Sequence, residues 1–154
     1  MSIFQSLGHV ALKVNNLDVS VAFYERLGFP VMLSLLNADG KPWIVYLRIS
    51  DEMYLELFPG GDGSPAAGPE KTGCHHLCLT VADIVKAEAD LATVGVTLMH
   101  PRKDAPGLDG NRGMWIADPD GNRIEIMEMS PDCIQFAAVK NLAAGGAPHE
   151  LTRY

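Results

Sequence analysis

Two stretches of the chain share one alternating pattern of apolar and polar positions. The segments His9–Val14 and His76–Val81 each start with a histidine, end five residues later with a valine, and carry an apolar residue at every second position. A period of two residues is typical of a β-strand with one buried face. We therefore predict two strands whose aliphatic side chains point into the core, while the two leading histidines point to the opposite face.

The residues that follow these strands repeat as well. The two histidines are 67 residues apart, and the same offset relates Asn16 to Asp83 and Gly28 to Gly95. Asn and Asp side chains accept hydrogen bonds from the first turn of a helix, and glycine commonly ends one. The apolar positions at helical spacing are Val19, Ala22, Phe23 and Leu27 in the first half and Ile84, Ala87, Leu91 and Val94 in the second. Each strand is therefore predicted to lead into an amphipathic helix with these residues in the core.

Further strand-like segments follow each predicted helix. The expected strands are Val31–Leu36, Trp43–Ile49 and Met53–Phe58 in the first half, and Thr97–His100, Gly113–Ala117 and Arg123–Met129 in the second. Turn sequences at 37–40 and 118–122 are rich in Asn, Asp and Gly, which tight turns favour. Each half is therefore predicted to be a βαβββ module, which places the chain in the α+β class.

The module boundaries follow from composition. Module one spans about residues 5–58 and module two spans residues 74–129, while the Gly-, Pro- and Ala-rich segment 59–73 is interpreted as a linker. Residues 130–154 are expected to form a C-terminal helix and tail, because a serine cap and a proline open this segment. With 154 residues, the chain has the usual size of one domain. Residues 1–154 are therefore predicted to form a single domain.

Composition and charge exclude several kinds of partner. Apolar residues make up 47% and charged residues 20% of the chain, the balance of an ordinary globular protein. No apolar run approaches the roughly 18 residues of a membrane helix, and residues 1–5 lack the features of a signal peptide. The net charge of −7 argues against nucleic acid, which requires clustered Lys and Arg. With only three cysteines, a disulfide framework is not expected, and we predict a cytoplasmic protein that binds neither membranes nor nucleic acids.

Two glutamates are predicted on the same face as the leading histidines. Glu56 stands between two leucines and Glu125 between two isoleucines, so both carboxylates face away from the helices if the aliphatic residues face them. A single glutamate or histidine on a strand is usually not a ligand, but here each module supplies one of each, as His9 and His76 share this face. Two imidazoles and two carboxylates form a nitrogen and oxygen donor set suited to Ni, Co, Mn, Fe or Zn.

Neighbouring residues offer alternatives to this set. His75 is a rival to His76, but the repeat spacing selects His76, and strand alternation turns His75 to the other side. Cys74 and Cys78 share a face with His76 and could supply a soft ligand. The favoured interpretation for both cysteines is a buried, reduced thiol that fills space.

Three segments carry a resemblance to a known family: Gly8–Val14, Phe23–Phe29 and Asp118–Glu125. They are similar to the vicinal oxygen chelate superfamily, which includes glyoxalase, extradiol dioxygenase, fosfomycin-resistance and methylmalonyl-CoA epimerase enzymes. The similarity covers about residues 5–129. It implies that the two modules build one eight-stranded, U-shaped mixed sheet around a divalent metal ion, the glyoxalase/bleomycin-resistance/dihydroxybiphenyl dioxygenase fold.

The resemblance also implies ligands and an activity. His9 and Glu56 from module one, with His76 and Glu125 from module two, match the two-His, two-Glu set of bacterial glyoxalase I. The implied enzyme is a metal-dependent isomerase or lyase, similar to lactoylglutathione lyase, that acts on a small hydroxy-carbonyl or dicarbonyl-derived substrate through a metal-stabilised enediolate. Glu125 is its implied general base and Glu56 a ligand or second base. Relatives of this size often complete the site across a homodimer, so a homodimer is expected.

Two other functions are compatible with the resemblance. One is an Fe(II) extradiol ring-cleaving dioxygenase, which uses two histidines and one carboxylate, and the other is a small-molecule-binding resistance protein, which usually lacks the ligands. The fourth ligand, Glu56, favours Lewis-acid isomerisation. Lys13, which stands where glyoxalase I usually carries Arg, is a candidate to bind an anionic substrate, and Arg112 is a second. The identity of the metal and the use of glutathione stay open.

Overall fold

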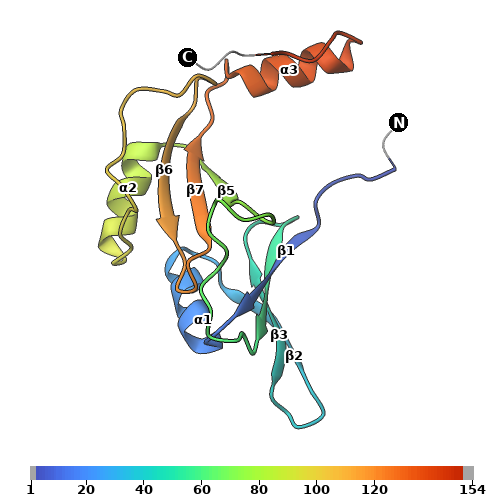
Figure 1. Ribbon diagram of the computed structural model, residues 1–154, viewed down its shortest axis with the longest axis vertical. Coiled ribbons are helices and arrows are strands. Elements are labelled where there is room, and N and C mark those ends of the chain that lie inside the picture. Colours follow the sequence, from blue (N-terminus) through green and yellow to red (C-terminus); the bar gives the residue numbers. More distant parts are fainter. Residues whose placement is uncertain (1–2, 151–154) are drawn as a thin grey trace. The chain divides into compact units, whose positions relative to one another are not determined.

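The computed structural model describes residues 3–150, and the first half of the chain builds a four-stranded sheet (Figure 1). Its elements are β1 (His9–Val14), α1 (Leu17–Arg26), β2 (Val31–Leu36), β3 (Pro42–Arg48) and β4 (Tyr54–Pro59). The strand order is β1-β4-β3-β2, with β1 parallel to β4 and the other pairs antiparallel. The first strand therefore lies beside the last strand of its own half.

The second half repeats this plan with three strands. Its elements are β5 (Leu77–Val81), α2 (Ile84–Thr93), β6 (Arg112–Ala117), β7 (Arg123–Glu128) and α3 (Ile134–Ala143). The strand order is β5-β7-β6, with β5 parallel to β7 and β6 antiparallel to it. The leading strand again pairs with the last strand of its half, as the repeat in the sequence requires.

The expected α+β class is confirmed, but a single eight-stranded sheet is not. Residues 3–150 contain seven strands in two sheets, because the predicted strand Thr97–His100 does not form. Only Met99 reaches the sheet, where its N–H donates to the Trp115 carbonyl at 2.7 Å. Pro101 follows this segment at once, and proline has no N–H to continue a ladder. The segment therefore contacts the edge of β6 without becoming a strand.

The chain divides into two compact units. One contains the residues up to Glu70 together with the turn Asp118–Asn122, and the other contains the remaining residues from Lys71 onward. The boundary falls within the segment 59–73 that was interpreted as a linker. The end of the predicted tail, 151–154, lies outside the described residues.

The caps predicted for the two helices are present. The Asn16 side chain accepts a hydrogen bond from the N–H of Val19 at 3.2 Å. The Asp83 carboxylate accepts bonds from two N–H groups in the first turn of α2. Gly28 and Gly95 follow the helix ends with φ of +89° and +70°, a conformation that side chains with a Cβ rarely adopt. Local sequence therefore sets where both helices begin and end.

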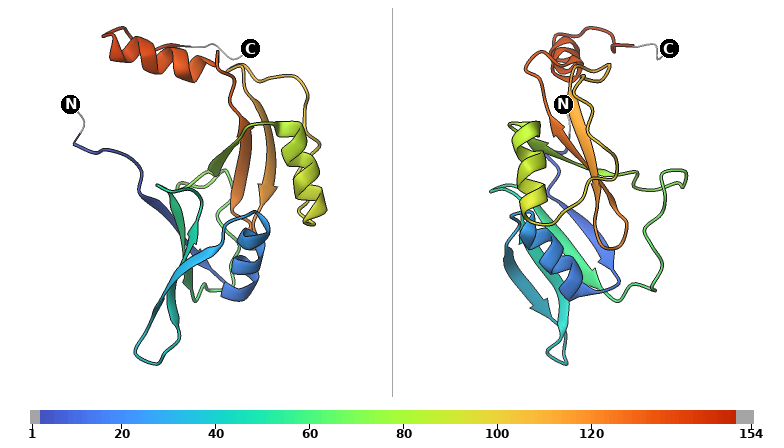
Figure 2. Two further views of the ribbon diagram at one scale, coloured as in Figure 1. Left: turned by 180° about the vertical axis from the view of Figure 1, so that it is seen from behind. Right: turned by 90° about the vertical axis from the view of Figure 1, so that its left-hand side faces the viewer.

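The buried face of α1 differs from the predicted one. Phe23 is in the core as expected, but Val19 and Ala22 are exposed, and Ser20 and Tyr24 are buried instead. The helix packs against β4, and Figure 2 shows it alongside the four-stranded sheet. In α2 the expected residues Ile84 and Leu91 are buried.

The turn Asp118–Asn122 explains why α1 buries polar residues. The Tyr24 hydroxyl donates to the Asp118 carboxylate at 2.8 Å, and the Ser20 hydroxyl donates to Asp120 at 3.4 Å. Burial, and then the nearby Asp118 charge, raise the pKa of Tyr24 far above its ordinary value. Two of the three segments that carried the family resemblance thus hold each other in place, and their contact is structural.

The C-terminal helix α3 begins at Ile134, three residues after the proline expected to open it. Ser130 instead starts a turn, in which its carbonyl accepts from the N–H of Cys133. The helix ends at Ala143, and Gly145 then adopts a φ of +81°. Among residues 3–150, no helix has both the length and the apolar character needed to cross a bilayer.

Candidate metal centre

His9 and Glu56 lie on neighbouring parallel strands of the first sheet. In this pairing Ala11 of β1 stands opposite Glu56 of β4, and His9 stands two residues before Ala11 on the same face. The His9 Nε2 atom is 3.6 Å from Glu56 Oε2. The histidine side chain is 44% exposed, whereas the glutamate side chain is only 10% exposed. The pair therefore presents its imidazole outward from a largely buried carboxylate.

Two tyrosines surround this first pair. Tyr46 of β3 stands directly opposite Glu56. Burial, and then the negative charge and hydrogen-bond acceptance of Glu56, raise the pKa of the Tyr46 hydroxyl. Tyr54 stacks its ring on His9, with ring centroids 5.2 Å apart. The carboxylate thus receives a neutral hydroxyl donor, and the imidazole is held against an aromatic ring.

His76 and Glu125 form the corresponding pair in the second sheet. Glu125 is on β7, opposite Cys78 of β5, and His76 immediately precedes β5. The His76 Nε2 atom is 3.2 Å from Glu125 Oε2, and the two side chains are 30% and 18% exposed. The two halves therefore build equivalent pairs from equivalent strands, although they share no strand.

The surroundings of the second pair include a thiol and an indole. Cys78 is exposed overall, yet burial of its thiol and then the Glu125 carboxylate raise its pKa to about 11. The Trp115 ring packs edge-on against the His76 ring at 4.9 Å between centroids. The interpretation of Cys74 and Cys78 as buried residues that fill space is wrong, since both residues are exposed overall.

His75 and Arg123 also reach the second pair. The Nδ1 atoms of His75 and His76 are 2.7 Å apart, and Arg123 Nη1 is 3.2 Å from His75 Nε2. Alternation predicted that His75 would point away from His76. Because β5 begins only at Leu77, both histidines precede the strand and strand alternation does not apply to them. The sequence gives no signal that Arg123 contacts His75. Arg123 has a long side chain, and its position on a strand does not determine which other side chains it reaches.

A cavity of about 680 Å³ opens beside Glu125 in the second unit. Its wall includes Lys103, Pro106, Trp115 and Met127. Gly113 also lines it, and a Cβ there would come within 3.6 Å of Glu125 Oε1. A carboxylate that borders a cavity lined by both polar and apolar side chains is positioned to meet a small organic molecule.

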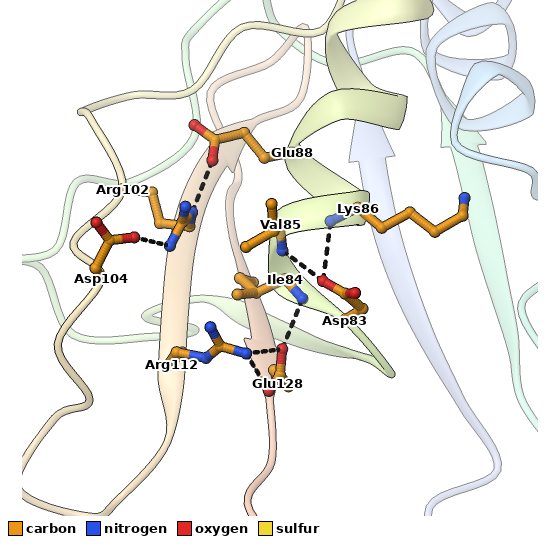
Figure 3. A network of polar contacts seen from close by, with 9 residues as sticks. All are labelled: Asp83, Ile84, Val85, Lys86, Glu88, Arg102, Asp104, Arg112 and Glu128. Atoms are coloured by element: carbon orange, nitrogen blue, oxygen red, sulfur yellow. Dashed lines mark hydrogen bonds and ion pairs between the residues drawn. The ribbon is translucent and has the colours of Figure 1, made fainter.

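The two candidate anion-binding residues lie in different settings. Lys13 is exposed on the same face of β1 as His9, and its Nζ donates to the Pro59 carbonyl at 2.6 Å. Arg112 is the first residue of β6 and stands opposite Glu128 of β7. Its Nη2 atom donates to both carboxylate oxygens, at 2.5 and 2.7 Å (Figure 3). The charge of Arg112 is therefore already paired within the fold.

Glu128 is a structural residue that the sequence analysis missed. Besides Arg112, its carboxylate accepts the N–H of Ile84 at the start of α2 at 2.7 Å (Figure 3). The same polar region contains Arg102, which pairs with Glu88 of α2 and with Asp104 (Figure 3). These contacts tie α2 to β6, β7 and the following loop.

The donor atoms of each pair suit a divalent metal ion. Two ligands bound to one ion at 2.0–2.2 Å are about 3.0–3.5 Å apart. The nitrogen–oxygen separation of the second pair, 3.2 Å, lies within this range, and that of the first pair, 3.6 Å, lies just above it. Each unit thus brings one imidazole and one carboxylate together. Across residues 3–150, no three His, Cys, Asp or Glu side chains are grouped so that they could hold a metal ion.

Comparison with known proteins gives consistent matches. The family model described as the Glyoxalase/Bleomycin resistance protein/Dioxygenase superfamily matches residues 6–126. An ethylmalonyl-CoA/methylmalonyl-CoA epimerase of Cereibacter sphaeroides is 30% identical over 121 residues, which cover 75% of this chain and 90% of that protein.

Solved structures agree with this match. A glyoxalase family protein from Enterococcus faecalis superposes with a TM-score of 0.71 at 26% identity, covering 82% of this chain and all of that one. A lactoylglutathione lyase from Agrobacterium tumefaciens shares the fold, with a TM-score of 0.59 at 23% identity, over 82% of this chain and 96% of that one.

Proposed function

Because the chain belongs to the glyoxalase/bleomycin resistance protein/dioxygenase superfamily, we propose that it is a metal-dependent isomerase or lyase of the glyoxalase I type. The observation that supports this proposal is the duplicated pairing of a histidine with a glutamate on parallel strands. An isolated pair could be an ordinary surface contact. Two pairs at equivalent positions of a repeat indicate a common task.

The proposed ligands are His9, Glu56, His76 and Glu125. Their imidazole nitrogens and carboxylate oxygens form a donor set suited to Ni, Co, Zn, Mn or Fe. A divalent ion bound there supplies positive charge beside the oxygen atoms of a substrate. We propose that the protein is a homodimer and that the full set is completed within one chain or between two.

Glu125 is the proposed general base. Its carboxylate borders the cavity, where it can take a proton from the carbon next to a carbonyl group and return it to the neighbouring carbon. Glu56 is largely buried and serves as a ligand or as a second base. General acid–base catalysis of this kind contributes about 10²–10⁴-fold to the rate.

A second candidate substrate class is suggested by the epimerase relative. Epimerisation of a thioester such as methylmalonyl-CoA also removes and returns a proton next to a carbonyl group. The same carboxylates can carry out this reaction, but the proton returns to the carbon it left. We therefore place both reactions in one chemical class and distinguish them by substrate.

The decisive experiment is solvent deuterium incorporation with the purified, metal-analysed protein. Methylmalonyl-CoA and the hemithioacetal of methylglyoxal and glutathione are incubated in D₂O, with and without chelator, and exchange at the carbon next to the carbonyl is measured. The Glu125→Gln variant should lose at least about 10²-fold of the rate. Glu128→Gln is the matched control, because Glu128 lies on the same strand but pairs with Arg112.

Four outcomes would contradict the proposal. Full activity of Glu125→Gln would remove the assigned base, and activity that survives complete metal removal would remove the metal. Oxygen uptake with catechols, in place of proton exchange, would instead identify an extradiol dioxygenase. Stoichiometric binding of a small molecule without turnover or metal would identify a resistance protein.

A further inference from the structure

A continuous series of close contacts runs from Arg123 to Glu125 through two histidines. Arg123 Nη1 lies 3.2 Å from His75 Nε2, and His75 Nδ1 lies 2.7 Å from His76 Nδ1. His76 Nε2 then lies 3.2 Å from Glu125 Oε2. The guanidinium also lies over the Trp115 ring, 4.5 Å from its centroid. Both nitrogens of both imidazoles therefore have a partner.

The chemistry of the end groups determines where the hydrogen atoms lie. A guanidinium only donates hydrogen bonds, so His75 Nε2 must accept and the hydrogen of neutral His75 must be on Nδ1. That hydrogen points at His76 Nδ1, which must therefore accept. The hydrogen of neutral His76 is then on Nε2 and faces the Glu125 carboxylate, which only accepts. All the donors thus point from Arg123 toward Glu125.

We propose that His75 is a positioning residue that sets the orientation and the tautomer of His76. This inference rests on the proposed function, in which His76 Nε2 is a metal ligand. Histidine ligands generally hold their second ring nitrogen in a hydrogen bond that fixes the ring. For His76 that second nitrogen is Nδ1, and its partner is His75.

A histidine suits this position because it can reverse its role. When His76 Nε2 binds a cation, the hydrogen of His76 must move to Nδ1, and His75 Nδ1 must accept it. His75 then carries its own hydrogen on Nε2, where the donor Arg123 opposes it. Toward His76, His75 can serve both states, whereas an aliphatic side chain serves neither. Metal binding at His76 is therefore coupled to the His75–Arg123 contact.

The other half of the chain shows that the fold does not require this arrangement. The position equivalent to His75, 67 residues earlier, is Gly8, and a Cβ there would meet no atom within 4 Å. His9 packs its ring on Tyr54 instead. The series of contacts from Arg123 through His75 and His76 to Glu125, called the relay below, is therefore a specific feature of the second pair.

Nitrogen NMR of the metal-free protein tests the relay directly. Long-range ¹H–¹⁵N spectra recorded about two pH units above the ordinary histidine pKa of about 6.5 report which ring nitrogen carries the hydrogen. We expect His75 as the Nδ1–H form and His76 as the Nε2–H form. In Arg123→Met, His75 should lose its preference for the Nδ1–H form. A wild-type spectrum with His75 in the Nε2–H form would overturn the proposal.

Zinc affinity, measured against a competing chelator, tests the positioning role. His75→Leu should weaken zinc binding by about 10–100-fold, and His75→Asn should largely restore it, because an amide can donate or accept at the Nδ1 position. His149→Leu removes an exposed histidine elsewhere and should leave the affinity unchanged.

The two measurements separate the relay from the proposed function. Equal zinc affinity of wild type and His75→Leu would overturn the positioning role while leaving the proposed metal site intact. If wild type bound no zinc but showed the expected tautomers, the proposed function and the link to metal would fall, and only the hydrogen-bonded chain would stand.

Discussion

Each candidate glutamate has a weakly acidic side chain directly opposite it on the neighbouring strand. Tyr46 stands opposite Glu56, and Cys78 stands opposite Glu125. Burial and the facing carboxylate raise the pKa of both groups. Both therefore stay protonated at neutral pH and can donate a hydrogen bond to the glutamate. The two halves reach the same arrangement with different residues.

The raised pKa of Cys78 predicts that its thiol reacts slowly with alkylating reagents. With a pKa of about 11, only about one Cys78 in a thousand is a thiolate at pH 8, against roughly a quarter of ordinary thiols of pKa 8.5. Iodoacetamide should therefore modify the exposed Cys74 at least about tenfold faster than Cys78. The rates are measured by peptide mass spectrometry of the folded, metal-free protein.

A matched pair of variants tests the cause of this slow reaction. Glu125→Gln should accelerate modification of Cys78 because it removes the facing charge, and Glu128→Gln should not. Equal rates at Cys74 and Cys78 in the wild type would show that the Cys78 thiol is not shielded as the structure indicates.

Helix α2 is held to its sheet by Glu128, which pairs with Arg112 and accepts a backbone N–H at the start of the helix. These hydrogen bonds, with that from Arg112 the largest, lower the pKa of the Glu128 carboxyl below its ordinary value. A depressed pKa stabilises the fold at pH values above the ordinary glutamate pKa of about 4.3 and ceases to do so as the pH falls through the lower, folded-state value.

Replacing Glu128 by Gln should therefore lower the melting temperature by a few degrees at pH 6–8. The difference from wild type should shrink as the pH falls below about 4, because the wild-type carboxyl then takes up a proton. Glu70→Gln, in the exposed linker, removes the same charge and serves as control. A difference that stayed constant down to pH 3 would show that charge at Glu128 does not stabilise the fold.

The proposed homodimer offers one way in which two histidine–glutamate pairs would serve one ion. If each site combines the first pair of one chain with the second pair of another, variants in different halves should complement each other. His9→Ala and His76→Ala proteins, mixed under conditions of subunit exchange, would form mixed dimers with one intact site. Zinc binding should then return to about a quarter of the wild-type level, since half the dimers are mixed.

Native mass spectrometry of the same mixture provides the control, because it shows whether mixed dimers form. If mixed dimers form and zinc binding does not return, the sites do not combine pairs from two chains. If only monomers are present, the proposed homodimer is wrong.

The internal repeat was enough to predict much of this fold. The alternation from His9 to Val14 placed the histidine opposite a buried Val14, and the caps at Asn16 and Asp83 were correct. These features depend on residues within a few positions of each other. The partners His9 with Glu56 and His76 with Glu125 also followed from the repeat, although the meeting of all four remains a prediction.

The errors arose where distant segments meet. The buried face of α1 turned toward Ser20 and Tyr24 because a turn about 100 residues away supplies hydrogen-bond partners for them. The pairing of Arg112 with Glu128 was missed, because only the register of β6 on β7 places the two residues opposite each other. Neither packing nor register can be obtained from the periodicity of one segment.

Local patterns in the chain therefore specified which residues share a face, where the helices begin and end, and which pairs of side chains could act together. These properties follow from backbone geometry over a few residues. The folded structure added the strand register, the polar partners of α1 and α2, and the contacts of His75 with His76 and Arg123. Such contacts join residues far apart in the chain, and they exist only when the whole unit has packed.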